Sequence, residues 1–151
     1  MDDLADLYQE IILNHNRRPR NEGALEPCDC QAEGFNPLCG DRITVYAKLD
    51  DQNDKALATV QFLGEGCAIS RASASIMTTM LAGLSKDEAF AKIKELSDML
   101  TSSEEPEADL AELGDLAALI GVRRFPARIK CATLAWHALG AALRGESEHQ
   151  E

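Results

Sequence analysis

Residues 43–63 read ITVYAKLDDQNDKALATVQFL, and this stretch decides the fold. Apolar and polar side chains alternate over residues 43–49 and again over residues 57–63, which is the period of a β-strand with one buried face. Both segments are rich in β-branched residues, which favour strands. The polar residues 50–55 between them are typical of a turn that joins antiparallel strands. The sequence therefore predicts a β-hairpin near the middle of the chain.

The sequence on either side of the hairpin predicts mainly helices. Apolar residues recur at helical spacing up to Ile12, and Pro19 disfavours continuation of that first helix. Ser85 begins a capping-box pattern, SKDE, which is typical of a helix N-terminus. A short extended segment over residues 32–35 is expected to add a third strand. Further helices are expected over residues 68–81, 86–100, 110–120 and 131–143.

These elements predict an α+β protein, with strands first and most helices later. We expect one domain over residues 1–145, in which a small antiparallel sheet of about three strands packs against about four to six helices. The charged residues 146–151 are expected to form a flexible C-terminal tail.

The composition excludes several classes of function. The chain has 151 residues, with 15 Lys and Arg against 26 Asp and Glu, and therefore a net charge of −11. Such an acidic protein repels phosphate, which argues against nucleic acid as a partner. We find no run of about 18 apolar residues that would span a membrane. The acidic N-terminus does not resemble a signal peptide, so we expect a cytoplasmic protein.

Five cysteines are the most informative residues for function. Their odd number and the absence of a secretory signal favour metal binding or thiol chemistry over a disulfide framework. Buried, inert thiols are the alternative. Cys39, Cys67 and Cys131 lie at predicted element boundaries. Cys67 and Cys131 would begin helices, where the helix dipole favours the thiolate.

Asp41 follows Cys39 by two residues, close enough for both side chains to reach one ion. Together with Cys67 and Cys131 they would supply three sulfur ligands and one oxygen ligand, a set that tetrahedral Zn²⁺ accepts. The spacing alone favours the alternative, in which the glycines shape turns and the cysteines pack in a core.

Three longer motifs surround these residues: NPLCGD at 36–41, GEGCAIS at 64–70 and FPARIKCATL at 125–134. They resemble the three cysteine motifs of the IscU/SufU family, and NHNRRPRN at 14–21 is also similar to that family. The resemblance implies a SufE/IscU-like α+β fold. It also implies a cysteine-rich site that handles sulfur from a cysteine desulfurase.

One position favours the SufU branch of that family. Scaffold members carry histidine immediately before the third cysteine, whereas this chain has Lys130, whose protonated amine has no lone pair for a metal. Residues 101–116 also resemble an extra segment of SufU-like members. The resemblance therefore implies a zinc-dependent sulfurtransferase with Asp41 as the fourth ligand. It would accept persulfide sulfur from a SufS-type desulfurase and pass it to downstream iron–sulfur assembly proteins. An IscU-type iron–sulfur cluster scaffold is the alternative.

Individual residues then receive predicted roles. We expect Cys39 to accept sulfur first because its loop contains glycine, with Cys131 as the second candidate. Arg128 is predicted to steady the anionic persulfide or to contact the partner, and an ordinary solvated side chain is the alternative. Cys28 and Cys30 match none of the three motifs and are interpreted as incidental, with a second metal clamp or a regulatory disulfide as the alternatives. No metal role is assigned to His15, His137 or His149.

Overall fold

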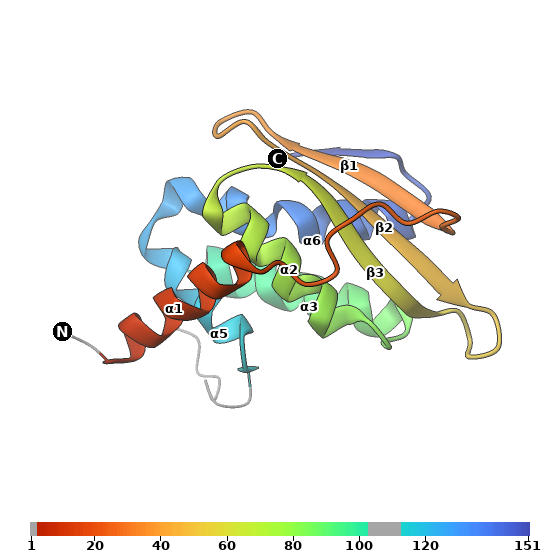
Figure 1. Ribbon diagram of the computed structural model, residues 1–151, viewed down its shortest axis with the longest axis horizontal. Coiled ribbons are helices and arrows are strands. Elements are labelled where there is room, and N and C mark those ends of the chain that lie inside the picture. The colour runs from red at the N-terminus through yellow and green to blue at the C-terminus, as the bar shows by residue number, and fades with distance from the viewer. Residues whose placement is uncertain (1–2, 103–112) are drawn as a thin grey trace.

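The computed structural model describes residues 3–102 and 113–151. Its helices gather on one side of a four-stranded sheet (Figure 1). The strands are β1 (Cys30–Asn36), β2 (Asp41–Asp50), β3 (Ala56–Glu65) and β4 (Glu148–Gln150), in the order β3-β2-β1-β4. This confirms the α+β class and the central hairpin, which is β2 and β3.

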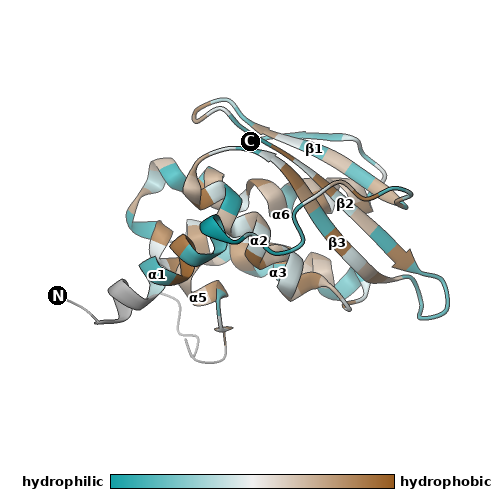
Figure 2. Cartoon of the chain, viewed as in Figure 1, coloured by the Kyte–Doolittle hydropathy of each residue, from teal (hydrophilic) through white to brown (hydrophobic). Residues whose placement is uncertain are grey.

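The strand β1 confirms the expected third strand and makes a second hairpin with β2. The two pair antiparallel from Cys30 opposite Ala47 to Asn36 opposite Asp41. Burial alternates along β2, where Ile43, Val45 and Ala47 are buried, and Figure 2 shows hydrophobic residues interleaved with hydrophilic ones along the strands. This periodicity decides which face of the sheet meets the helices.

The C-terminal segment differs from its sequence-based prediction. Residues 148–150 are not a frayed tail but form β4, which pairs parallel with residues 33–35 of β1. The Glu33 N–H donates to Ser147 O at 2.9 Å, and the Glu151 N–H donates to Phe35 O at 3.0 Å. Without β4, strand β1 would be an open edge with unpaired backbone groups. The sheet is therefore mixed and has four strands rather than about three.

The helices largely follow the predicted ranges. The capping box is confirmed, because Ser85 Oγ accepts from the Glu88 N–H at 3.1 Å and Glu88 Oε1 accepts from the Ser85 N–H at 3.0 Å. The helix expected over residues 110–120 is shorter where it is described, and residues 110–112 lie outside the described part. The five described α-helices are α1 (Asp3–Arg17), α2 (Ala68–Leu81), α3 (Lys86–Thr101), α5 (Leu116–Ile120) and α6 (Ile129–Leu143).

Helix α6 is the centre of the hydrophobic core. Twelve of its residues are buried, so the helix is in contact with protein on nearly all sides. A Cβ atom on Gly34 of β1 would lie 3.0 Å from Leu134 Cδ1 and 3.1 Å from Ala138 Cβ. Glycine at this position therefore lets α6 lie close against the sheet. None of the described helices is long and apolar enough to cross a membrane.

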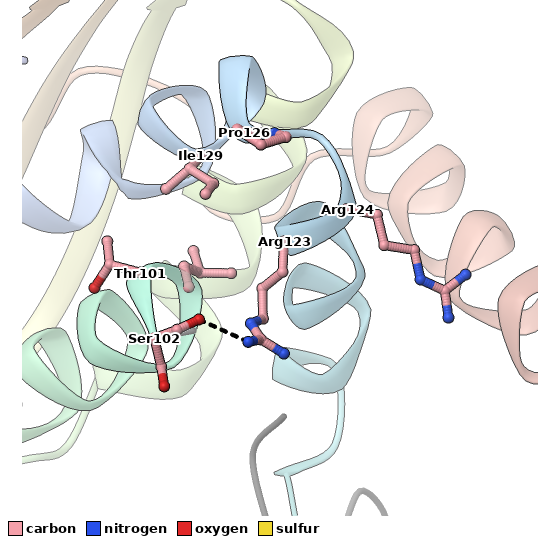
Figure 3. A pocket seen from close by; sticks show the side chains of 7 residues that line it. Thr101, Ser102, Arg123, Arg124, Pro126 and Ile129 are labelled. Carbon is pink, nitrogen blue, oxygen red and sulfur yellow. Dashed lines mark hydrogen bonds between the residues drawn. The ribbon is translucent and has the colours of Figure 1, made fainter. Parts of the chain in front are cut away.

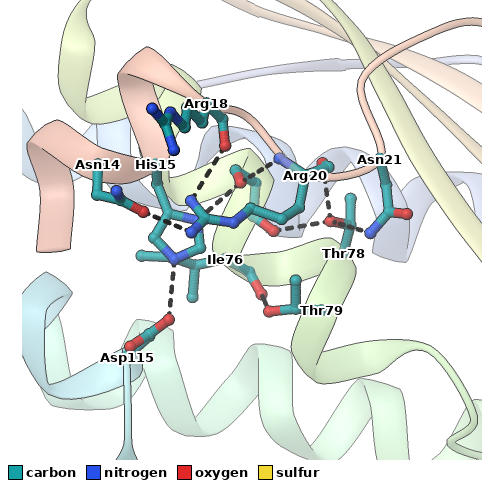
Figure 4. A network of polar contacts seen from close by, with 10 residues as sticks. Asn14, His15, Arg18, Arg20, Asn21, Ile76, Thr78, Thr79 and Asp115 are labelled. Carbon is teal, nitrogen blue, oxygen red and sulfur yellow. Dashed lines mark hydrogen bonds and ion pairs between the residues drawn. The ribbon is translucent and has the colours of Figure 1, made fainter.

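A buried histidine connects three helices (Figure 4). His15 on α1 is 3% exposed. Its Nδ1 lies 2.7 Å from Ser75 Oγ on α2, and its Nε2 lies 2.8 Å from Asp115 Oδ2 just before α5. The Arg20 N–H also donates to Ser75 Oγ, at 2.8 Å. Both ring nitrogens of His15 are thus engaged in holding α1 against α2 and α5.

Candidate metal centre

Three segments of the chain meet at one end of the sheet. The loop between β1 and β2 carries Cys39, and β2 begins with Asp41. Strand β3 runs back antiparallel and ends with Glu65 opposite Arg42, which places Cys67 beside Asp41. Helix α6 begins near the same end and supplies Cys131.

Asp41 is the most highly connected side chain of this region, and it is fully buried. Its Oδ1 accepts from the Cys67 N–H at 2.9 Å and from Ser70 Oγ at 3.2 Å, and its Oδ2 accepts from Asn36 Nδ2 at 3.2 Å. Burial alone would raise the pKa of Asp41, but the hydrogen bonds outweigh it and lower the pKa. Asp41 is therefore an ionised carboxylate at neutral pH.

Two sulfur atoms lie beside this carboxylate. Cys39 Sγ and Cys131 Sγ are 3.3 Å apart. Asn36 Nδ2 lies 3.5 Å from Cys131 Sγ, and Arg128 Nη1 lies 3.5 Å from Cys39 Sγ. One ligand atom each from Cys39, Asp41 and Cys131 lie within 4.8 Å of one another. We call these three residues the cysteine–aspartate site.

The two thiols have different environments. Cys39 is exposed, whereas Cys131 is buried. Burial raises the pKa of Cys131, and the neighbouring Asp41 and Cys39 raise it further. Its place near a helix N-terminus was expected to favour the thiolate, whereas desolvation and the neighbouring carboxylate favour the neutral thiol.

Cys67 stands slightly apart from the other predicted ligands. Its Sγ caps α2 by accepting from the Ser70 N–H at 3.4 Å, and it is not among the ligand atoms within 4.8 Å of one another. Its backbone N–H nevertheless holds Asp41. The structure thus brings together three of the four predicted ligand residues and connects the fourth to them.

The donor set fits zinc. Two cysteine sulfurs and one carboxylate oxygen are common zinc ligands, and Cys67 is near enough in the fold to be considered as the fourth. The carboxylate is already ionised, and hydrogen bonds to both of its oxygens fix its position. Such supporting contacts are typical of metal sites.

Sequence reasoning missed the residues that hold Asp41 in place. Asn36 and Ser70 are buried and donate to its two oxygens. A Cβ on Gly66 would lie 2.7 Å from Asp41 Oδ1 and would also collide with Ser70 Oγ. All three residues belong to the motifs NPLCGD and GEGCAIS. Membership of these motifs could therefore have indicated their role, whereas their residue types alone could not.

Two large apolar side chains of the motifs that carry the site are exposed to solvent. Leu38 is 73% exposed and Phe125 is 61% exposed. A pocket of about 500 Å³ lies along the segment that leads into α6 (Figure 3), and Arg123 donates there to Ser102 O at 2.7 Å. The pocket includes none of the predicted site residues; it is lined by Leu100, Thr101, Ser102, Arg123, Arg124, Pro126 and Ile129.

The other two cysteines lie away from this site. Cys28 and Cys30 are half-buried at the start of β1, and Cys28 Sγ lies 3.5 Å from Gln31 Oε1. Asp29 between them accepts from the Leu49 N–H at 2.6 Å. This segment therefore helps to attach the start of β1 to β2.

Comparison with known proteins gives one consistent result. The family model described as the NifU-like N terminal domain matches residues 7–143. The chain is 45% identical to the zinc-dependent sulfurtransferase SufU of Bacillus subtilis (strain 168), over 90% of this chain and 88% of that protein. It is 40% identical to the iron–sulfur cluster assembly scaffold protein IscU of Streptococcus pyogenes serotype M1, over 97% of this chain and 89% of that protein. The crystal structure of FiSufU from Fervidobacterium islandicum AW-1 superposes with a TM-score of 0.78 at 34% identity, over 89% of this chain and 94% of that chain.

Proposed function

Because the chain belongs to the family of NifU-like N-terminal domains, we propose that it works in iron–sulfur cluster assembly as a zinc-dependent sulfurtransferase. One structural observation carries the proposal: an ionised, immobilised Asp41 lies beside the thiols of Cys39 and Cys131. Lys130 occupies the position where scaffold members carry histidine, and its protonated amine has no lone pair for a metal. Asp41 would therefore be the fourth ligand of the site.

Cys39, Asp41, Cys67 and Cys131 would hold the Zn²⁺ ion, which keeps bound cysteines in the thiolate form. Asn36, Ser70 and the Cys67 N–H keep the Asp41 carboxylate ionised and in place. Contacts from three segments thus fix the position of the oxygen ligand.

The proposed reaction is the transfer of one sulfur atom from a SufS-type cysteine desulfurase. The thiolate of Cys39 attacks the outer sulfur of the persulfide on the partner's cysteine. A sulfur–sulfur bond forms on Cys39, the donor's sulfur–sulfur bond breaks, and the donor cysteine leaves as a thiolate. The transfer involves no net oxidation. The sulfur then passes to downstream iron–sulfur assembly proteins, and the need for reduced thiols assigns the reaction to the cytoplasm.

Exposure supports Cys39 as the first acceptor. It is the exposed thiol of the site, and the Arg128 guanidinium lies 3.5 Å from its sulfur, where it would stabilise an anionic persulfide. Cys131 is buried and is the second candidate. The exposed Leu38 and Phe125 provide apolar surface near the site for a protein partner.

The first test is the metal content of protein purified without added metal. We expect at least about one zinc per chain, as a four-ligand site requires, and about one zinc fewer in the Asp41→Ala variant than in wild type. A wild-type protein without zinc would contradict the proposal.

The second test follows sulfur directly. The chain is incubated with a SufS-type desulfurase and cysteine, and persulfide on each cysteine is measured by mass spectrometry. We expect persulfide on Cys39 and its loss in Cys39→Ser. Arg128→Ala should transfer sulfur more slowly than wild type, whereas Arg124→Ala, an exposed arginine of the same segment, should not. Equal effects of both arginine variants would contradict the role of Arg128.

The second candidate function is that of an iron–sulfur cluster scaffold, and the relative named IscU favours it. It requires iron and acid-labile sulfide in the purified or reconstituted protein. If iron and acid-labile sulfide were found instead of zinc, the scaffold function would be favoured over sulfur transfer despite Lys130.

A further inference from the structure

A second group of potential metal ligands lies where the C-terminal strand meets α6. It consists of His137 on α6, His149 on β4 and Glu151 immediately after β4. One ligand atom from each residue lies within 4.8 Å of the other two. We call these residues the histidine–glutamate site. None of them belongs to the cysteine–aspartate site or to the proposed sulfur transfer.

The sheet pairing explains why these residues meet. His149 lies opposite Gly34 of β1, and alternate residues along a strand face the same side, so His149 and Glu151 share a face. Because Gly34 has no side chain, α6 approaches the sheet closely at Ala138. The neighbouring His137 is thereby brought to the two tail residues.

Glu151 is the centre of the group. Its Oε1 lies 2.5 Å from His137 Nδ1 and 3.6 Å from His149 Nε2, and it accepts from Thr133 Oγ1 at 3.0 Å. The backbone N–H of Glu151 donates to Phe35 O, which anchors the residue to the sheet. The two imidazole rings are 5.3 Å apart between centroids. Contacts from α6 and from β1 thus hold Glu151 in place.

One ring nitrogen of the group lacks a hydrogen bond. His149 Nε2 is buried and has no hydrogen-bond partner among the described residues, and its 3.6 Å separation from Glu151 Oε1 exceeds hydrogen-bond distance. A buried polar atom without a partner is uncommon in folded proteins and calls for an explanation. A ligand that accepts the nitrogen lone pair would satisfy it.

We propose that His137, His149 and Glu151 form a binding site for a divalent transition-metal ion such as Zn²⁺. Two imidazole nitrogens and one carboxylate oxygen suit metal ions of borderline softness, and both Zn²⁺ and Co²⁺ fit this donor set. The ion binds His137 Nδ1 and Glu151 in place of the proton they share, and it binds the unpartnered His149 Nε2. Three protein ligands leave a further position for water.

Metal binding at this site would join β4 to α6. That helix also carries Cys131, and β1, the partner of β4, ends at Asn36 beside Asp41. An ion that binds the folded arrangement better than the unfolded chain stabilises it. We therefore expect the ion to protect the backbone of residues 147–151 from hydrogen exchange.

The test is a Zn²⁺ titration of the full chain in which the histidine side chains are followed by NMR. The chain has three histidines, so each ring can be assigned by substitution. We expect the ring signals of His137 and His149 to shift together and to saturate, whereas those of His15 stay unchanged. Repeating the titration with Co²⁺ on protein that carries one zinc, at the cysteine–aspartate site, should add absorption without the intense sulfur-to-cobalt bands of a thiolate site.

Matched variants decide whether the site is specific. Glu151→Gln and His149→Gln should each weaken Zn²⁺ binding at the histidines at least about tenfold. Glu148→Gln removes the same charge from an exposed position of β4 and should leave binding unchanged. Circular dichroism without metal shows whether each variant is folded. If only one of Glu151→Gln and His149→Gln folds, that variant alone is enough for the test. Absence of the ring shifts, or equal affinity in all variants (an adventitious ion only), would overturn the proposal. Asp41→Ala should leave the ring shifts intact, which separates this result from the proposed sulfur transfer.

Discussion

Helix α6 carries one residue of each of two very different sites. Near its N-terminus, Cys131 joins Cys39 and the fully buried Asp41. About two turns later, His137 joins His149 and the partly buried Glu151. The first site contains sulfur and faces the end of the sheet where three segments converge. The second contains nitrogen and depends on a strand of three residues.

The two carboxylates show what separates the sites. Burial by itself would raise the pKa of each, and hydrogen bonding lowers both. The donors to Asp41 include a backbone N–H, an amide and a hydroxyl, which do not change charge near neutral pH. Glu151 instead depends mainly on His137, an imidazole of another element, and on Thr133. The Asp41 carboxylate is therefore held by neutral donors from several segments, whereas the Glu151 carboxylate is held mainly by helix α6.

Removing the carboxylate of Asp41 should have the largest effect on this comparison. In Asp41→Ala, the Cys67 N–H, Asn36 and Ser70 lose their common acceptor inside the protein. We expect the free energy of unfolding to fall by about 3 kcal/mol, because several buried donors are left unsatisfied. Urea denaturation with a chelator and a reductant measures this without metal. Asp41→Asn keeps one acceptor oxygen and should lose about half as much; equal losses would show that the hydrogen bonds contribute little.

A methyl group at Gly66 should disturb the same site through packing alone. Its Cβ would lie 2.7 Å from Asp41 Oδ1, so the carboxylate or the chain must move. We expect Gly66→Ala to cost about 2 kcal/mol of stability, as overpacking commonly does, and to weaken zinc binding. Gly121→Ala is the control, since nothing lies within 4 Å of its added Cβ. If both variants behaved alike, close packing around Asp41 would not be the reason for glycine at position 66.

Local patterns in the sequence predicted the parts of the fold that depend on local physics. Alternation predicted β2 and β3, and the bounds of α2 match the predicted helix, Ala68–Leu81. The strand β4 could not be predicted in this way. Its pairing depends on the open edge of β1 and on partners for Glu151 at Thr133 and His137, all distant in the sequence.

The same distinction applies to the candidate site. The resemblance of the motifs predicted that Cys39, Asp41, Cys67 and Cys131 share one site. The structure places three of them together and leaves Cys67 slightly apart. The resemblance did not predict that Cys131 is buried, because burial depends on how α6 packs against α2 and the sheet. Nor did it predict that Asn36 and Ser70 would donate hydrogen bonds to Asp41, since asparagine and serine are not common metal ligands. Contacts between distant segments decide these features.

The unequal burial of the two thiols sharpens the comparison within the first site. Cys39 is exposed beside Arg128, whereas burial raises the pKa of Cys131. In metal-free protein we expect iodoacetamide to modify Cys39 at least about tenfold faster than Cys131, because the thiolate is the reactive form. Peptide mapping by mass spectrometry at successive times measures both rates. Similar rates would mean that the site opens faster than it reacts, and that burial does not protect Cys131.

The smallest expected effect concerns the pH dependence of the second site. The pKa of Glu151 is lowered in the folded protein, since hydrogen bonds from His137 and Thr133 outweigh its burial. The unfolded chain then binds more protons once the pH falls toward and below the ordinary carboxyl value of 4.5, and stability is lost there. With a chelator at neutral pH, Glu151→Gln should be less stable than wild type by no more than about 1 kcal/mol, because the desolvation of a partly buried pair offsets most of its attraction. That difference should shrink as the pH falls through the lowered pKa of Glu151, while the exposed Glu148→Gln should differ little from wild type at any pH. A difference that stays constant with pH would assign the contribution of Glu151 to its packing rather than its charge.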